Sequence, residues 1–219
     1  TDFGHPFTSK RPTLNTNYFE TFNRKNVRLI DLKTNPIIKI TKNGIRTRKE
    51  ELKFDKIIFA TGYDALSGPI LSLNLIGRKK IKLKKYWKNG PKTFLGLMIP
   101  NFPNFFIISG PGSPSVLTNV PAQIQQHVEW ISNFIKYLEK VKSISVEPSF
   151  KETENWVKKI NKLAKQSLFM KAKNSWYKGD NIPGKPKKFI PYPAGLPQYR
   201  KICNKVQKRM YKEFKISLK

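Results

Sequence analysis

A loop of turn-forming residues before a predicted helix is the first place where residue types and spacing could do chemistry. Residues 110–115 read Gly-Pro-Gly-Ser-Pro-Ser and follow an apolar run at 104–109 that predicts a strand. Apolar residues then recur at helical spacing over 122–140, with Pro121 near the first turn and Asn119 as the cap. Such a helix aims free N–H groups and its positive dipole end at the loop, which suits a phosphate or the electron-rich edge of a flavin. Most loops of this kind bind nothing, so a purely structural loop is the alternative.

Other side chains that commonly do chemistry are sparse. His5 precedes a proline in a predicted turn, and His127 lies inside the predicted helix without a second histidine or a cysteine nearby, so both are predicted to be structural. Cys203 is the only cysteine, which excludes an intramolecular disulfide and a cysteine-based metal site and predicts a small buried apolar residue. Lys10 and Arg11, taken alone, indicate a solvated surface pair. We expect no metal and find no general acid/base pair.

Length and composition allow a buried core. The 219 residues are 38% hydrophobic and 12% aromatic, enough for one large domain or for parts of two. The sequence opens at Thr1 without a charged-then-apolar leader, which indicates either a processing site or a cut through a longer protein. No window approaches the roughly 18 consecutive apolar residues of a membrane-spanning helix. We therefore expect a soluble, cytoplasmic protein.

The charge is strongly positive. Forty-three lysines and arginines against 14 acidic residues give a net charge of +29, which favours an anionic partner such as nucleic acid. The lysines, however, are spread along the whole chain, and no nucleic-acid motif accompanies them. We therefore favour a sequence-wide lysine bias and expect no nucleic-acid partner, with a basic nucleic-acid-binding module as the alternative.

The first third of the chain predicts strands. Residues 27–32 and 37–41 are short β-branched runs, and a Lys-Asn-Gly turn at 42–44 follows them. Residues 54–60 predict a largely buried strand that ends in a glycine turn, so 60–64 is a candidate site or hinge.

Two more helices are predicted toward the end of the chain. One carries Trp156, Ile160 and Leu163 on a face, and the other carries Ile202, Val206 and Met210. A loop between them is rich in turn residues but contains the adjacent pair Trp176 and Tyr177.

Four stretches in this order resemble the Baeyer-Villiger flavin monooxygenases of the cyclohexanone and phenylacetone type. They are residues 4–12 (Gly-His-Pro-Phe-Thr-Ser-Lys-Arg-Pro), 60–65 (Ala-Thr-Gly-Tyr-Asp-Ala), 110–115, and 175–177 (Ser-Trp-Tyr) with 183–186 (Pro-Gly-Lys-Pro). The likeness runs nearly end to end, and the combination is far more specific than any one stretch.

The resemblance implies an α/β fold with two dinucleotide-binding, Rossmann-like domains in the full-length protein. On this basis residues 1–62 are the C-terminal part of an NADPH-binding domain, and residues 63–219 are the C-terminal part of an FAD-binding domain. The glycine fingerprints for both dinucleotides would lie before Thr1 and are absent. We therefore expect this chain alone to bind FAD poorly and to be inactive.

The resemblance also implies roles for individual residues. Arg11 resembles the catalytic arginine that stabilises the negatively charged flavin peroxide and the tetrahedral adduct with the ketone. Lys10 resembles the lysine that meets the 2′-phosphate of NADPH, and Trp176 resembles the tryptophan that folds over bound NADP. Val120 matches a position whose backbone N–H approaches the flavin.

Ser115, Val116 and Leu117 fall in the family's loop beside the substrate pocket. The implied activity is oxygen insertion into a small-molecule ketone, giving an ester or lactone with NADPH and O₂. A related flavin monooxygenase that oxidises nitrogen or sulfur is the alternative. The sequence leaves the oligomeric state open.

Overall fold

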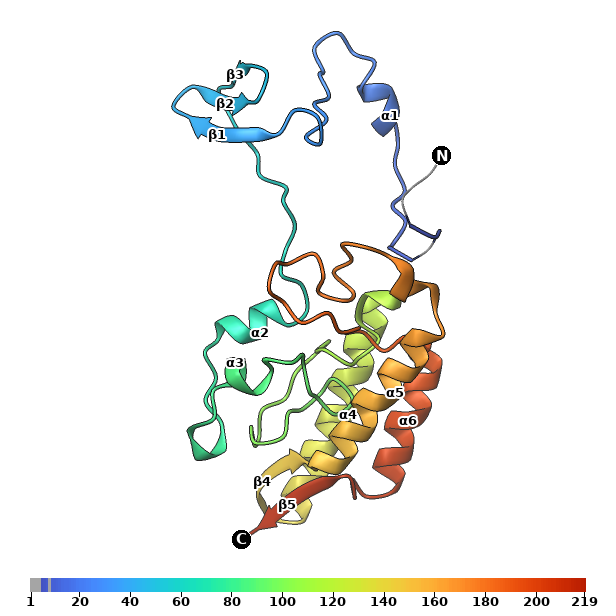
Figure 1. Cartoon of the computed structure of the whole chain (residues 1–219). Helices are drawn as coiled ribbons and strands as arrows, with labels where there is room; N and C mark the ends of the chain where they lie inside the picture. Colours follow the sequence, from blue (N-terminus) through green and yellow to red (C-terminus); the bar gives the residue numbers. More distant parts are fainter. Residues whose placement is uncertain (1–4, 8) are drawn as a thin grey trace. The chain divides into compact units, whose positions relative to one another are not determined.

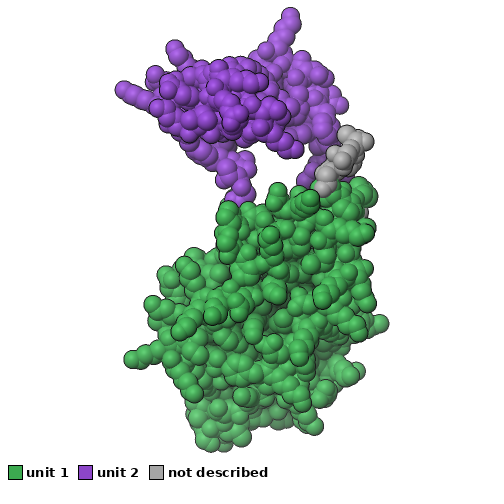
Figure 2. Space-filling view, in the orientation of Figure 1, with its two compact units in different colours: residues 1–11, 63–219 green, residues 12–62 purple. Residues whose placement is uncertain are grey.

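The computed structural model describes residues 5–7 and 9–219, so Gly4 and Thr8 of the first family-like stretch lie outside the described residues. The chain divides into two units (Figure 2). Unit 1 comprises Thr1–Arg11 and Tyr63–Lys219, and unit 2 comprises Pro12–Gly62. One division falls after Gly62, where the sequence-based boundary also lies, but residues up to Arg11 group with unit 1. The assignment of either part to a particular coenzyme stays a prediction.

Unit 2 contains a small three-stranded antiparallel sheet in the order β1-β2-β3 (Figure 1). Its elements are α1 (Tyr18–Thr21), β1 (Ile37–Thr41), β2 (Gly44–Thr47) and β3 (Glu51–Lys53). Thr41 pairs with Gly44, which confirms the predicted turn at this point. Gly44 has φ 157°, and a Cβ there would lie 1.9 Å from the Leu52 carbonyl oxygen. The hairpin therefore requires glycine at this position.

The other two strands predicted in this unit are wrong. Residues 27–32 and 54–60 form no strand, and neither run finds a strand partner among the described residues. Ile58 is 91% exposed and Phe59 is 66% exposed, so the second run is not buried either. The composition of a run indicates a preference for strand, but a strand forms only where a neighbour satisfies its N–H and C=O groups.

Unit 1 is built on three long helices and a two-stranded antiparallel ribbon. Figure 1 shows α4, α5 and α6 running beside one another, with the ribbon at one end. The long elements are α4 (Val120–Lys140), β4 (Ser143–Pro148), α5 (Phe150–Lys165), α6 (Gly195–Lys208) and β5 (Phe214–Leu218). The short helices are α2 (Gly68–Ser72), η1 (Arg78–Lys80), α3 (Leu83–Tyr86), η2 (Ser115–Leu117) and η3 (Leu168–Lys171).

The three predicted helices are confirmed. The Asn119 side chain caps α4 by accepting from the Ala122 N–H at 3.1 Å. In α6 Cys203 and Val206 are buried, as predicted. Met210 is an exception because α6 ends before it and its φ of 53° is left-handed, which leaves the side chain 60% exposed.

Aromatic rings make up much of the unit 1 core. Phe134 stacks on Tyr211 with ring centroids 4.0 Å apart, and Trp156 stacks on Tyr192 at 5.0 Å. The Trp130 indole N–H donates to the Cys203 carbonyl at 3.0 Å. Large flat side chains that stack closely give this core a fixed packing.

The strand predicted at 104–109 is wrong. This segment makes one isolated bridge, between Phe106 and Met98. Asn104 and Ser109 have left-handed φ angles of 59° and 57°, which interrupt an extended run at both ends. An irregular segment therefore leads into the loop at 110–115.

Candidate functional site

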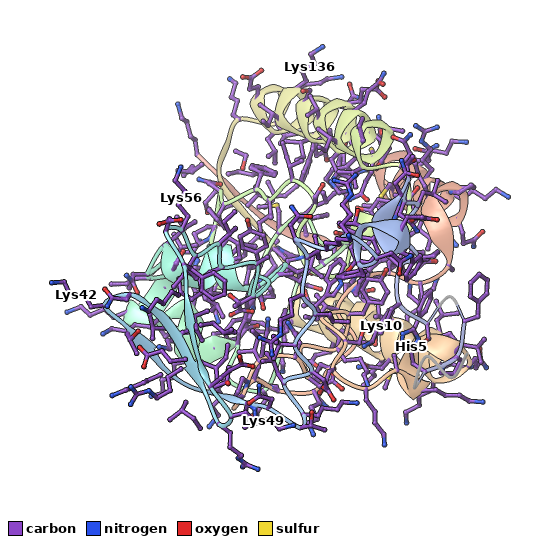
Figure 3. The ribbon with its side chains drawn as sticks, turned by 90° about the horizontal axis from the view of Figure 1, so that it is seen from above. His5, Lys10, Lys42, Lys49, Lys56 and Lys136 are labelled. Carbon is purple, nitrogen blue, oxygen red and sulfur yellow. The ribbon has the colours of Figure 1, made fainter. Side chains whose placement is uncertain are left out.

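A tight turn near the start of the described chain presents Lys10 and Arg11. The Ser9 N–H and hydroxyl both donate to the Pro6 carbonyl, at 3.1 and 2.5 Å, and Ser9 is fully buried. His5 also lies in this turn, near Lys10 (Figure 3). The turn fixes the backbone, while the Lys10 side chain is half-buried and Arg11 is exposed.

Arg11 lies against the segment that the sequence predicts to shape the substrate pocket. Its Nη1 donates to the Val116 carbonyl in η2, across 105 positions of sequence. The same guanidinium lies close enough to Tyr177 to oppose the rise in that phenol's pKa caused by burial. The structure thus brings a permanent positive charge, η2 and the Trp-Tyr loop together.

Side-chain hydrogen bonds of buried polar residues hold the loop at 110–115 in place. The Ser113 hydroxyl donates to the Gly110 carbonyl at 2.8 Å and accepts from Gln123 Nε2 at 3.0 Å. Gly112 has φ 92°, and Ser115, which is buried, has a left-handed φ of 49°. A buried serine in this conformation is strained, and such strain gathers at ligand-binding segments.

His127 supports the same loop from α4. Its Nδ1 accepts from the Ser109 N–H at 3.0 Å, and the ring is fully buried. Burial lowers the pKa of His127 to about 4, so the imidazole is neutral at ordinary pH and can accept this bond. A neutral, buried imidazole that holds the backbone just before the loop agrees with a structural role.

The first turn of α4 offers a free donor. Val120 is the first residue of this 21-residue helix, and its N–H finds no hydrogen-bond partner among the described residues. Pro121 has no N–H, and the Ala122 N–H is already capped by Asn119. The Val120 N–H can therefore serve an electronegative ligand atom beside η2.

Trp176 lies at the edge of the core, in a closed loop. It is half-buried, and its ring centroid is 4.5 Å from that of buried Tyr177. The Ser175 N–H donates to Asp180 Oδ1 at 2.6 Å, and Lys178 Nζ lies 3.0 Å from Asp180 Oδ2. The Trp176 ring therefore packs against Tyr177, while part of the side chain stays exposed to solvent.

An ion pair that the sequence did not predict joins two of the family-like stretches. Lys185 Nζ contacts the Asp64 carboxylate and lies 3.4 Å from the Ala65 carbonyl oxygen. Because Lys185 and Asp64 lie far apart along the chain, no sequence pattern indicates that they form an ion pair. The contact ties the loop that carries Trp176 to the stretch at 60–65.

Not all predicted site residues come together. Arg11 contacts Val116 and lies near Tyr177, whereas the Lys10 ammonium makes no hydrogen bond or ion pair with the described residues. Burial raises the pKa of Cys203 to about 12, so this thiol is not a nucleophile. Within residues 5–7 and 9–219, no cluster of three or more histidine, cysteine or acidic side chains could hold a metal ion.

None of the described helices combines the length and the apolar character needed to cross a membrane.

Comparisons with known proteins agree on one group of enzymes. The chain is 38% identical over 211 residues to cyclohexanone 1,2-monooxygenase of an Acinetobacter species, and 42% identical over 204 residues to a Baeyer-Villiger monooxygenase of Pseudooceanicola batsensis. These matches cover 96% and 93% of this chain. It is also 35% identical to a phenazine N-monooxygenase of Lysobacter antibioticus, over 94% of this chain and 38% of that enzyme. No protein-family model matches the sequence.

Solved structures give the same result. Cyclohexanone monooxygenase from Rhodococcus sp. Phi1 bound to NADP+ superposes with a TM-score of 0.92 at 33% identity, over 96% of this chain and 39% of that one. The OTEMO complex with FAD and NADP superposes with a TM-score of 0.91 at 33% identity, over 97% of this chain and 39% of that one.

The chain spans about 38% of the length of the relatives that it matches. Over that stretch its mixture of helices and sheet is the α/β architecture of these flavin monooxygenases. Identities of 38% and 42% over more than nine-tenths of the chain, with a TM-score of 0.92, show that it belongs to the Baeyer-Villiger monooxygenase family.

Proposed function

We propose that the protein carrying this chain is an FAD-dependent monooxygenase that uses NADPH and O₂ to insert an oxygen atom into a small-molecule ketone, giving an ester or lactone. The end-to-end likeness to enzymes named for this reaction supports the proposal most strongly. The contact of Arg11 with η2 adds support from the structure, because it puts a permanent cation beside the proposed ketone pocket.

FAD, when bound, would supply the activation of oxygen, and the residues of this chain would supply position and charge. Arg11 stays cationic at any working pH. At about 4 Å, in a site of effective dielectric constant about 20, it offers roughly 4 kcal/mol to an anion. Its bond to the Val116 carbonyl holds the guanidinium beside η2, where negative charge would develop on the substrate oxygen.

The other site residues would bind and orient. The free N–H of Val120 fits an acceptor atom of the flavin ring, since no described group competes for it. Ser115, Val116 and Leu117 form η2 and would shape the preference among ketones. Because these residues follow a firmly braced loop, they would present a fixed wall to the substrate.

Two residues would bind the nicotinamide coenzyme. The half-buried Lys10 would meet the 2′-phosphate of NADPH with its unpaired ammonium, and Trp176 would cover the bound coenzyme with its exposed face. On this proposal residues 1–62 belong to the NADPH-binding domain and residues 63–219 to the FAD-binding domain. Lys10 and Arg11 group with unit 1, which would let one short turn serve both coenzymes.

Oxidation of nitrogen is the second candidate, because one relative is a phenazine N-monooxygenase. An enzyme of full family length that contains this chain should be supplied with NADPH, O₂ and panels of ketones, amines and sulfides. We expect ester or lactone from at least one ketone, with consumption of NADPH and FAD bound to the protein. Oxygen transfer to nitrogen alone would overturn the ketone proposal in favour of the second candidate.

A further inference from the structure

A cavity of about 490 Å³ lies in unit 1, and neither Arg11 nor any residue of η2 lines it. Its walls come from residues 89–93, from α5, from Pro111 and Gly112, and from Pro186 and residues 188–190. The volume falls within the range of about 300–1,000 Å³ that small-molecule sites occupy. It is therefore a place in this chain, apart from Arg11 and η2, where a ligand of moderate size could be accommodated.

The floor of the cavity is apolar. Ile160, Phe189 and Ile190 line it and are each no more than 5% exposed in the chain. Val157 adds a further apolar side chain from α5. Such a floor favours a ligand with a hydrocarbon body, because burial of its CH₂ groups is favourable by about 0.8 kcal/mol each in transfer from water.

The charged groups at the cavity favour a single negative charge on that ligand. Lys188 is exposed, lines the cavity and makes no ion pair with the described residues. Lys92 also lines it, but its Nζ lies 2.6 Å from Oε1 of Glu154, another lining residue. One uncommitted cation attracts a monoanion, while the nearby Glu154 carboxylate would oppose a second negative charge.

The cavity wall is joined by backbone hydrogen bonds to both loops of the proposed site. The Gly112 N–H donates to the Ile190 carbonyl at 2.9 Å. The Ile190 N–H donates to the Tyr177 carbonyl at 2.8 Å, and the Lys188 N–H donates to the Lys178 carbonyl at 3.0 Å. Residues 188–190 therefore connect the loop at 110–115 with the loop that carries Trp176. A ligand resting on them would stiffen both loops.

We propose that this cavity binds a medium-chain alkyl carboxylate, with its carboxylate on Lys188 and its chain over Ile160, Phe189 and Ile190. The ligand would lie apart from Arg11 and η2, neither of which lines the cavity. Binding to the cavity does not depend on the proposed monooxygenase activity, so the two proposals can fail separately.

The first test is calorimetric titration of an enzyme of full family length that contains this chain with octanoate and with neutral octanamide. We expect saturable binding of octanoate and about threefold to fivefold weaker binding of octanamide, since the ion pair with the exposed Lys188 ammonium is lost. Lys188→Ala should weaken octanoate binding about threefold to fivefold and remove its advantage over octanamide. Lys187→Ala changes an adjacent exposed lysine that does not line the cavity, and should leave the affinity within twofold. Absence of saturable octanoate binding, or equal effects of the two lysine variants, would overturn the proposal.

The second test locates the ligand. Octanoate should slow hydrogen exchange at the Gly112 and Ile190 amides, which lie in the wall, but not in β1 of unit 2. Asn161→Trp should block the cavity and abolish binding while the circular dichroism spectrum is retained. Slowed exchange only outside the cavity wall, or wild-type affinity in folded Asn161→Trp, would contradict the assignment. Should Asn161→Trp fail to fold, the lysine pair and the exchange pattern still decide the question.

Discussion

The two units of this chain differ in the burial of their apolar side chains. In unit 1, Trp130 and Phe134 are no more than 2% exposed, within a core shared by three helices and a ribbon. In unit 2, Leu29, Ile58 and Phe59 are 72%, 91% and 66% exposed. No large apolar side chain of the described residues 12–62 is buried.

This difference shows which part of the chain can position a site by itself. The proposed site residues Arg11, Val116, Val120 and Trp176 all belong to unit 1, where hydrogen bonds of the buried Ser113 and His127 hold the segment that precedes η2. Unit 2 keeps its hairpins through backbone bonds and exposed ion pairs such as Arg46–Glu51. Such pairs contribute little free energy of folding, so we expect unit 2 to be less stable than unit 1.

The largest expected effect is a contrast in stability between the two units. Phe134→Ala removes a ring that stacks on Tyr211 in the core and should lower the free energy of unfolding by about 3–5 kcal/mol. Ile58→Ala removes an exposed side chain and should change it by less than about 0.5 kcal/mol. Urea unfolding of this chain, followed by circular dichroism, measures both. Similar losses in the two variants would show that unit 2 has a core comparable to that of unit 1.

The sequence predicted the parts of the fold that depend on local pattern. Apolar residues at helical spacing and the Asn119 cap identified α4, and the Lys-Asn-Gly turn identified the β1–β2 hairpin. The runs at 54–60 and 104–109 failed as strands because their partners, or their backbone angles, are set by residues elsewhere.

For the site, the sequence supplied the residue types through the family resemblance but not their contacts. Nothing in the pattern reveals that Arg11 bonds Val116 or that Lys185 pairs with Asp64, because each contact spans more than 100 positions. Tyr177 was noted only as the neighbour of Trp176, although the structure shows it buried beside Arg11.

The second prediction concerns His127, which accepts a hydrogen bond from the Ser109 N–H just before the loop at 110–115. His127 has its pKa lowered from 6.5 to about 4 by burial, so the unfolded chain binds this proton more readily than the folded chain does. The contribution of His127 to the free energy of unfolding should therefore be fully present above pH 6.5. It should decrease by about 3 kcal/mol as the pH drops toward 4. His127→Gln keeps an acceptor and should flatten that slope, whereas His5→Gln should not. Equal slopes in wild type and His127→Gln would contradict the proposed cause.

The third prediction separates Trp176 from the core tryptophans. Trp176→Ala in an enzyme of full family length should weaken retention of NADP about tenfold, while flavin content stays nearly intact. Trp156→Ala removes a buried ring stacked on Tyr192 and should instead destabilise the fold. Coenzyme titration, flavin absorbance and thermal unfolding distinguish the two. If Trp176→Ala also unfolds or loses FAD, Trp176 is a core residue and not a coenzyme contact.

The smallest expected effect is that of Lys10. Lys10→Ala should raise the Michaelis constant for NADPH about fivefold to tenfold and that for NADH much less, because only NADPH carries the extra phosphate. Lys25→Ala, at an exposed lysine of unit 2, serves as the control. Steady-state kinetics with both coenzymes measure the effect. A proportional rise for NADPH and NADH would show that Lys10 does not read the 2′-phosphate.

The central claim is that unit 1 places Arg11 where it promotes oxygen insertion, and Arg11→Ala tests it most directly. In an enzyme of full family length, we expect bound FAD and NADPH-dependent flavin reduction to persist while ester formation falls by about two to three powers of ten, for a loss of roughly 3–4 kcal/mol. Arg11→Lys should also be severely impaired because it loses the planar fork. Arg48→Ala, at an exposed arginine of unit 2, should leave the rate unchanged. Stopped-flow absorbance of the flavin together with quantified ester gives the result, and ester formation by Arg11→Ala at a near wild-type rate would contradict the claim.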